Sequence, residues 1–484
     1  MQLDSRFTIQ FNGELYNQEL LQPSAKFRLV EFLHSKLIEF DYNVIKTIGY
    51  IEGEFAYSLL DKQESKLYFG KDVLGKKSLA YSQPEEDSIL ISSCTPSTDD
   101  KKHFKECLNG VIYQYDLETH TITEIDFNSN SDLPSRYTLS IPEPSLETEM
   151  IPLLHSKLEM AVKARIDTIH PVHESTAKLA ILFSGGIDCT LLAAISATIS
   201  KPGTVIDLLN VSFHNPRTKT KPANTPDRKL ALKSWAQLCL TYPKIKFQLV
   251  EVDVEYEEYV KHKSRVIGLI YPNDTEMDLS IAIAFYFASR GQGNRVVFDP
   301  SLNLKEPDFS ILDRIPYDSE VKVLLSGLGA DELFGGYTRH ERILTHYANS
   351  IRKGEIVHGS QEFYDSEVKE RLVQELQTDL NNLWIRNLSR DDKVISCWSK
   401  ELRYPFLDHH FIEFVTKELS VNEYKMYINL ETGELIRKRG LRLLAKELGL
   451  DWVAGEAKRA IQFGAKSAKM EVGTSKMKGT DKLS

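Results

Sequence analysis

Apolar residues follow two different patterns on either side of residue 125. Before it, short apolar runs such as RFTIQF (6–11) and GEFAYSLLD (53–61) alternate with turns, which is typical of antiparallel strands. Apolar spacing of three and four residues predicts one helix in this part, over 25–40. Residues 1–125 therefore predict an α+β domain built on an antiparallel sheet.

Beyond residue 147, helices alternate with short buried strands. An amphipathic helix over 150–166 precedes the strand KLAILF (178–183), and a further helix leads to the strand VIDLLNVSF (205–213). This alternation predicts an α/β domain with a doubly wound parallel sheet. After Tyr337 the pattern becomes mostly helical.

Two segments show neither pattern. Residues 126–146 are rich in Ser, Asn, Asp and Pro and predict a linker. Residues 465–484 are rich in Lys, Ser and Gly and predict a disordered tail. The expected organisation is a first domain over 1–125 and a second over 147–464.

Composition narrows the class of protein. The 484 residues are 42% hydrophobic and 27% charged, as in soluble globular proteins, and are enough for two or three domains. The net charge of −9 argues against broad nucleic-acid binding, which needs many phosphates neutralised. No run is long enough to span a membrane, the start lacks a secretory signal, and the five cysteines are scattered without a CxxC pair. We therefore expect a cytoplasmic protein without disulfides or a zinc ribbon.

A glycine-rich segment, Ser184-Gly185-Gly186-Ile187-Asp188, directly follows the strand 178–183. Paired glycines let the backbone approach a phosphate, and the following helix directs free N–H groups at it. Ligands of doubly wound sheets bind beyond the carboxyl ends of the strands, where this loop lies. A turn capped by Asp188 is the simpler interpretation, but Ser-Gly-Gly-x-Asp after a strand is typical of enzymes that cleave ATP between the α and β phosphates.

The segment LLSGLGADELFGGY (324–337) repeats this order, with Ser326-Gly327 after a strand and Asp331 at a helix start. Carboxylates at the ends of two strands, Asp188 and Asp331, are suited to share Mg²⁺ and so neutralise a leaving pyrophosphate. In the simpler interpretation, Asp331 and Glu332 only stabilise a helix N-terminus.

Several segments together resemble the asparagine synthetase family. In the second half these are SGGIDC (184–189), SGLGADELFGGY (326–337), NLSRDDKVISCWSKELRYPFLD (387–408) and KRAIQFGAKSAKM (458–470). In the first half, FNGELYN (11–17), IEGEFAYSLLD (51–61) and FGKDVLGKKSL (69–79) resemble class II glutamine amidotransferases. MDLSIAIAFYFASRG (277–291) points to the eukaryotic asparagine synthetase domain-containing branch. The resemblance implies an Ntn-type α+β sandwich, truncated at its start, followed by a domain of the ATP pyrophosphatase type.

The resemblance also implies a reaction. In the family, ATP converts aspartate into β-aspartyl-AMP and pyrophosphate, and ammonia then displaces AMP to give asparagine. By position, the residues assigned to ATP are Ser184, Gly185, Gly186, Asp188, Val211, Ser326 and Gly327. Asp188 and Asp331 are the assigned Mg²⁺ ligands. Lys458, with Asp331, is the catalytic candidate, because the family has a Lys there that stabilises charge on the reacting phosphate.

Other charged residues of the family motifs have a structural interpretation. Arg390, Asp391 and Asp392, like Glu401 and Arg403, are expected to form buried ion pairs rather than catalytic groups. Lys458 lies near other lysines, so its assignment rests on the flanking residues.

The first half departs from the amidotransferases. Family members have Cys directly after the initiator Met, with the α-amine as base, whereas residue 2 is Gln. Asn12, Gly13 and Glu14 remain as a vestigial glutamine site, and PSAKF (23–27) replaces the Asp-bearing segment that grips glutamine. A chain begun at a downstream Met and a real loss of glutaminase both stay open. In either case no glutamine hydrolysis is expected.

The second departure is Leu328, where studied asparagine synthetases carry Glu. Leu cannot accept a proton, so the acceptor chemistry stays open. The leading hypothesis is an AMP-forming amide ligase that uses ATP and Mg²⁺ to activate aspartate or a related carboxylate for attack by free ammonia or an unidentified amine. A non-catalytic nucleotide-binding scaffold is the alternative, and a tRNA-modifying enzyme fits the loop but not the acidic charge. Partners are expected to be small molecules, without nucleic acid or membrane, and a homodimer stays open.

Overall fold

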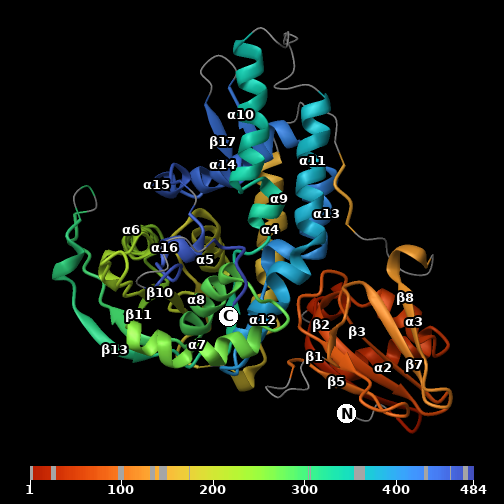
Figure 1. Ribbon diagram of the computed structural model, residues 1–484. Helices are drawn as coiled ribbons and strands as arrows, with labels where there is room; N and C mark the ends of the chain where they lie inside the picture. The colour runs from red at the N-terminus through yellow and green to blue at the C-terminus, as the bar shows by residue number, and fades with distance from the viewer. Residues whose placement is uncertain are drawn as a thin grey trace.

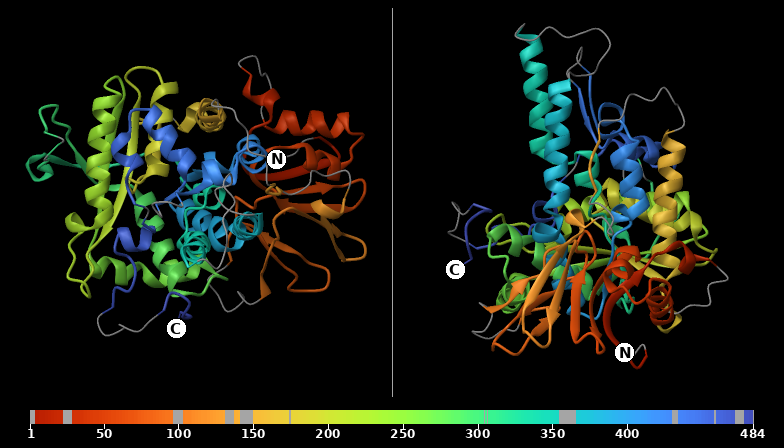
Figure 2. Two further views of the ribbon diagram at one scale, coloured as in Figure 1. Left: turned by 90° about the horizontal axis from the view of Figure 1, so that it is seen from above. Right: turned by 90° about the vertical axis from the view of Figure 1, so that its right-hand side faces the viewer.

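A computed structural model describes most of the chain and shows two parts. The described residues are 4–22, 29–95, 103–130, 137–140, 150–173, 175–303, 305, 307–353, 366–429, 434–457, 459–471 and 478–483. The N-terminal part, red to orange in Figure 1, lies beside a larger part that contains the remaining elements. The two views of Figure 2 show the same division.

The N-terminal part contains two antiparallel sheets. The larger has the order β1 (Phe7–Leu15), β2 (Gly53–Asp61), β3 (Lys66–Lys71), β7 (Val111–Asp116), β8 (Ile122–Asp126). The smaller has the order β5 (Leu90–Ser92), β4 (Ala80–Ser82), β6 (Lys105–Glu106). Three helices accompany them: α1 (Gln18–Leu21), α2 (Leu29–Glu39) and α3 (Val44–Tyr50). The predicted helix over 25–40 is found as α2, whereas α1 and α3 were not predicted.

Two apolar clusters hold these layers together. One face of the larger sheet packs on α2 and α3 through residues such as Phe32, Leu37 and Ile48. The other face packs on the smaller sheet through aromatic side chains such as Phe69 and Tyr113, which stack with ring centroids 5.1 Å apart. Alternation of side chains along each strand supplies both faces.

The larger part is built on a seven-stranded sheet. Its order is β13 (Arg314–Asp318), β12 (Gln292–Val296), β11 (Lys246–Val254), β10 (Val205–Phe213), β9 (Leu179–Leu182), β14 (Val323–Leu325), β15 (Glu401–Arg403). The strands from β11 to β15 in this order are parallel, but β12 and β13 pair antiparallel to β11 and to each other. The sheet is therefore mixed, which corrects the predicted all-parallel sheet. The QGNRV segment that forms β12 is only partly buried, so it lacks the apolar run that marks a parallel strand.

Helices cover both faces of this sheet. They are α4 (Met150–Asp167), α5 (Ile187–Ile199), α6 (Pro226–Thr241), α7 (Tyr256–Ile270), α8 (Glu276–Arg290), α9 (Ala330–Phe334), α10 (Thr338–Arg352), α11 (Ser366–Asn381), α12 (Ser389–Ser396), α13 (His409–Lys417), α14 (Arg439–Glu447), α15 (Asp451–Ala454) and α16 (Ile461–Gly464). A short hairpin, β16 (Met426–Ile428) with β17 (Leu435–Arg437), precedes α14. Helices α5 and α6 pack together on β9, β10 and β11, while α8 packs with α7 and α12. Helices α10 and α11 project side by side (Figure 1).

Buried ion pairs connect the two parts. The Arg165 guanidinium donates to Glu54 of β2 at 3.0 and 3.1 Å and also pairs with Asp408. The Asp392 carboxylate accepts from the backbone N–H and hydroxyl of Ser78 at 2.8 and 2.7 Å. Desolvated pairs of this kind require both partners, because a lone buried charge costs several kcal/mol. Each part therefore supplies hydrogen-bond partners for buried charged groups of the other part.

The two segments predicted to lack structure differ from expectation where they are described. In the predicted linker, Leu139 is buried and the Ser140 N–H donates to Thr416 at 3.0 Å. In the predicted disordered tail, Met470 is buried, and Phe213 donates to the carbonyl of Ala465 at 2.9 Å. Hydrogen bonds from Asn215 to the carbonyls of Lys466 and Ala468 also hold this segment beside β10. Among the described residues, no helix combines the length and apolarity needed to cross a membrane.

Candidate functional site

Two glycine loops meet at the carboxyl ends of adjacent strands. β9 pairs directly with β14 in parallel, with Ile181 opposite Leu325. The loops that follow these strands therefore leave the sheet side by side. A Cβ placed on Gly327 would lie 2.9 Å from the Cβ of Asp188, so the two segments are in contact and position 327 has no room for a side chain.

The first loop, 183–186, connects β9 to α5. Gly185 has φ +79°, and a Cβ there would lie 2.5 Å from the backbone nitrogen of Ala231, so α6 packs directly on this glycine. The Ser184 hydroxyl accepts from the Gly186 N–H at 3.4 Å. Gly186 caps α5 without a side chain, and Asp188 lies in the first turn. The helix start thus presents backbone N–H groups and one carboxylate to the same space.

The second loop, 326–329, connects β14 to α9. Gly329 has φ +101° and is the N-cap of α9, and a Cβ there would overlap Leu407 at 2.5 Å. Gly336 makes room for the catalytic candidate, because a Cβ on it would lie 1.7 Å from Oδ1 of Asp331. The neighbouring Glu332 is buried and accepts from the Tyr337 hydroxyl at 2.6 Å. Asp331 and Glu332 therefore differ in their contacts. Asp331 reaches the first loop through the ammonium of Lys438, which contacts both loops.

Lys438 lies between the two loops and was not predicted as a site residue. Its ammonium donates to both carboxylate oxygens of Asp188, at 2.8 and 2.6 Å, and pairs with Asp331 at 2.7 Å. Burial alone would lower the pKa of Lys438, but the two carboxylates outweigh it and raise the pKa above its ordinary value. Its backbone adopts φ +54°, uncommon for a residue other than glycine, at the start of α14.

A cavity of about 420 Å³ opens around these groups. This volume is in the range of small-molecule sites. The sequence-predicted residues that line it are Ser184, Gly186, Asp188, Val211, Ser326, Gly327 and Asp331. Gly185 lies behind the wall against α6. Lys458 is outside the described residues, but its neighbours Ala457 and Arg459 line the cavity.

Further charged residues were missed because they belong to no glycine loop. Arg437 and Arg442 line the cavity beside Lys438 and add positive charge. Asp227 of α6 also lines it and is packed against Gly464, where a Cβ would approach the carboxylate to 1.9 Å. Burial raises the pKa of Asp227 to about 7, while Arg459 lowers it in part. A mixed lining of this kind can bind an anion and a cation together.

One wall of the cavity is apolar. Met277, Ile281 and Phe285 line it from α8, and their spacing of four residues places them along one face of that helix. Leu328 lines the cavity from the second loop and packs partly against the core. Position 328, where the sequence differs from studied asparagine synthetases, therefore lies in the wall of the cavity.

The charged residues predicted to be structural are buried ion pairs. Arg390 donates to Asp391 at 2.8 Å and to Asp278 at 3.1 Å, and it lines the cavity with Asp391. Arg403 donates to Glu401 at 2.7 Å. These pairs position α12 and β15 beside the site.

The three residues predicted to form a vestigial glutamine site, Asn12, Gly13 and Glu14, lie on β1. Gly13 has φ +128°, and a Cβ there would overlap the Glu54 carbonyl at 1.9 Å. Glu14 is 3.4 Å from Arg403, but burial raises its pKa to about 7. Asn12 pairs with Ala56 in the sheet. The segment PSAKF (23–27) lies outside the described residues.

Burial keeps several of the thiols protonated. Cys107 is fully buried between the two sheets, and burial raises the pKa of its thiol to about 12. Burial also raises the thiol pKa of Cys189 to about 11 and of Cys239 to about 12. The thiolate is the reactive form, so these groups are inert at neutral pH.

Comparison with known proteins identifies the class first. The Asparagine synthase family model matches residues 306–426, which include the second glycine loop, and the Glutamine amidotransferase domain model matches residues 1–100. The protein thus combines an amidotransferase-like part with an asparagine synthase-like part.

Relatives then identify the family. The asparagine synthetase domain-containing protein of Saccharomyces cerevisiae is 42% identical over 99% of this chain and 83% of its own length. The human asparagine synthetase domain-containing protein 1 is 26% identical over 95% of this chain and 84% of its own. The glutamine-hydrolyzing asparagine synthetase of Rattus norvegicus is 24% identical over 84% of this chain and 63% of its own length. The chain belongs to the family of asparagine synthetase domain-containing proteins.

Proposed function

We propose that this protein is an ATP-dependent, AMP-forming amide ligase that activates aspartate or a related carboxylate for attack by ammonia. The observation that carries the proposal is the convergence of Asp188 and Asp331 on one cation, the Lys438 ammonium, between two glycine loops. A site for ATP with its metal needs N–H groups for phosphate, oxygen ligands for the metal and positive charge near the leaving group. All three are present around one cavity.

Each residue has a role in this proposal. The backbone N–H groups at Ser184 to Gly186 bind the phosphates, and the wall near Val211 receives the adenine. Asp188 and Asp331 would hold Mg²⁺, which they fit because both are oxygen donors that already reach one cation. When bound, Mg²⁺ neutralises charge on the pyrophosphate. Lys438 moves its ammonium from the carboxylates to the phosphates.

The proposed reaction has two steps. A carboxylate oxygen of the acceptor attacks the α-phosphorus of ATP, and the bond to the pyrophosphate oxygen breaks. Ammonia then attacks the carbonyl carbon, and AMP leaves with the original carboxylate oxygen. The excess proton of the amine goes to water, because Leu328 has no group that accepts it.

Free ammonia is the proposed nitrogen donor. The amidotransferase-like part retains Asn12 and Gly13, but the buried thiol of Cys107 is protonated at neutral pH. Addition of glutamine to the purified chain is expected to release no glutamate. Stoichiometric glutamate release would refute this part of the proposal.

Pyrophosphate release tests the proposal as a whole. The chain with ATP, Mg²⁺, aspartate and ammonium is expected to release pyrophosphate, and Asp188→Asn is expected to lower the rate about 100-fold or more. Asp167→Asn is the matched control, because the Asp167 side chain is exposed at the end of α4, and it is expected to have no effect.

A non-catalytic nucleotide-binding scaffold is the second candidate. Leu328 favours it, because an apolar side chain stands where acceptor chemistry needs a polar one. The scaffold predicts ATP binding without pyrophosphate release for every carboxylate and amine supplied.

A further inference from the structure

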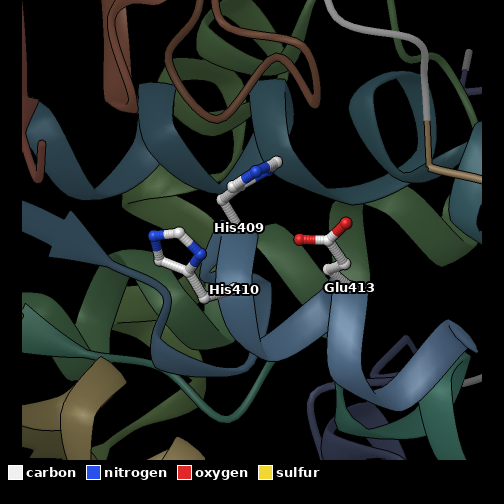
Figure 3. Close-up of side chains that lie close together, drawn as sticks. All are labelled: His409, His410 and Glu413. Atoms are coloured by element: carbon white, nitrogen blue, oxygen red, sulfur yellow. The ribbon is translucent and has the colours of Figure 1, made fainter. Parts of the chain in front are cut away.

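Three potential metal ligands project from the first turns of α13, far in sequence from the glycine loops. Figure 3 shows the rings of His409 and His410 and the carboxylate of Glu413 around a common space. One ligand atom from each lies within 4.8 Å of the other two. The centre of such a triangle is at most about 2.8 Å from each atom, so shifts of up to roughly 0.6–0.8 Å reach the roughly 2.0–2.2 Å of Zn–N and Zn–O bonds.

The beginning of α13 is held rigidly. Asp408 caps the helix by accepting from the Phe411 N–H at 3.1 Å, and the same carboxylate pairs with the buried Arg165. The opposite face of the helix is packed into the core through Phe411 and Phe414. The three side chains are therefore presented from a fixed backbone, which lowers the cost of assembling a site.

His409 is oriented by a second residue. Its Nδ1 lies 2.8 Å from the hydroxyl of Tyr137. Histidines that bind metals commonly use one ring nitrogen for the ion and the other for such a hydrogen bond, which sets the tautomer. The contact leaves Nε2 to face an ion.

The N-terminal part places a further carboxylate beside His410. Oε2 of Glu52 lies 3.4 Å from Nε2 of His410. Glu52 is itself fixed, because its N–H donates to Asn17 at 2.9 Å and its carbonyl accepts from the Tyr16 N–H at 2.7 Å. Glu52, Tyr137 and His409 line one cavity at the boundary of the two parts.

We propose that His409, His410 and Glu413, completed by Glu52, form a structural Zn²⁺ site that joins the two parts of the protein. Two imidazoles and two carboxylates suit zinc, whereas Mg²⁺ prefers oxygen ligands and water. Four protein ligands make a closed site, as in structural zinc centres. The present partner of Glu413 is Lys417, and an exposed pair of this kind yields readily to a divalent ion.

Metal binding to the full chain tests the proposal. After treatment with EDTA, the chain is expected to bind one Zn²⁺, measured by competition with a chromogenic chelator and by elemental analysis. Co²⁺ in its place is expected to give tetrahedral d–d absorption without a thiolate charge-transfer band, which separates this site from the cysteines. His409→Asn with His410→Asn is expected to abolish binding, and Tyr137→Phe to weaken it about 10- to 100-fold.

His214→Asn is the matched control, because His214 also pairs with an exposed glutamate, Glu255, but has no part in the cluster. It is expected to leave zinc affinity unchanged. Glu52→Gln is expected to weaken binding and to leave Co²⁺ with an additional water ligand. Zinc affinity that is the same in the double His variant and the unaltered chain overturns the proposal, as does a Co²⁺ spectrum with thiolate character. Circular dichroism of each metal-free variant shows whether the fold is retained.

Discussion

The ammonium of Lys438 lies 2.8 and 2.6 Å from the two carboxylate oxygens of Asp188, a residue 250 positions earlier in the chain. Asp331 contacts the same ammonium from the second glycine loop. This buried cation therefore connects the two loops. Any cation that enters with a nucleotide must share or take over these carboxylates.

Replacing Lys438 by Met removes this cation. Asp188 and Asp331 then lose the cation that they share, and the loss of one partner of a buried ion pair costs about 3–5 kcal/mol. We expect unfolding by urea to show a loss of this size, and Mg²⁺ to restore part of it. Lys446→Met, on the exposed face of α14, is the control and is expected to change stability by less than about 0.5 kcal/mol. A Lys438→Met protein as stable as the control, with no response to Mg²⁺, would contradict the role given to Lys438.

Replacing Leu328 by Glu restores a proton acceptor to the second loop. A positioned general base commonly contributes 10²–10⁴-fold, so we expect ammonia-dependent amide formation to rise at least about tenfold. The Leu328→Met variant keeps the volume and the apolar character, and its rate should stay unchanged. The amide product is measured by mass spectrometry over a series of ammonium concentrations. Retained ATP binding with no gain in rate would count against this role for position 328.

The stability of the protein should depend on pH through Asp227. Burial raises its pKa to about 7 in the folded chain, against about 3.9 in an unfolded one. Because the folded pKa is the higher, the cost of the buried carboxylate is absent below about pH 4 and is fully present above pH 7. Asp227→Asn removes this cost, so its stabilising effect should be greater at pH 8 than at pH 5 by roughly 2–3 kcal/mol. Urea unfolding at both values measures this, and an equal effect at the two pH values would refute it.

The contact between the two parts should depend on Arg165. Its replacement by Met leaves Glu54 and Asp408 buried without their shared cation, at a cost of about 3–5 kcal/mol. Lys163 lies two residues away on α4 and forms only an exposed pair with Asp167, so Lys163→Met should cost less than about 1 kcal/mol. Thermal unfolding of the two variants side by side checks the difference. Equal losses would show that the buried network does not join the parts.

The two glycine loops could be predicted from the sequence because local residues determine them. Ser-Gly loops after apolar strands give the turn, and Asp188 and Asp331 follow at helix starts. Their convergence could not be predicted from either loop, since it depends on the pairing of β9 with β14. Lys438 carries no local signal at all. It follows a two-stranded hairpin and reaches the site only because α14 packs against α5.

Predictions from composition were wrong for segments whose structure depends on a few residues. The lysine-rich segment after Gly464 predicted disorder, yet Met470 is buried and the Ser467 hydroxyl donates to the Ser280 carbonyl at 2.6 Å. The antiparallel strands β12 and β13 were missed because β12 is only partly buried and β13 is mostly exposed at the edge of the sheet. The His409 and His410 cluster also has no signal in sequence beyond two adjacent histidines, since Tyr137 and Glu52 come from distant segments.

Oxygen transfer from the acceptor to AMP tests the proposed ligase most directly. Aspartate labelled with ¹⁸O in its β-carboxylate is incubated with the chain, ATP, Mg²⁺ and ammonium, and the AMP is examined by mass spectrometry. We expect one labelled oxygen in the phosphate of AMP, since AMP leaves with the carboxylate oxygen that attacked phosphorus. Unlabelled AMP, or ADP as the nucleotide product, would contradict acyl adenylation at this site.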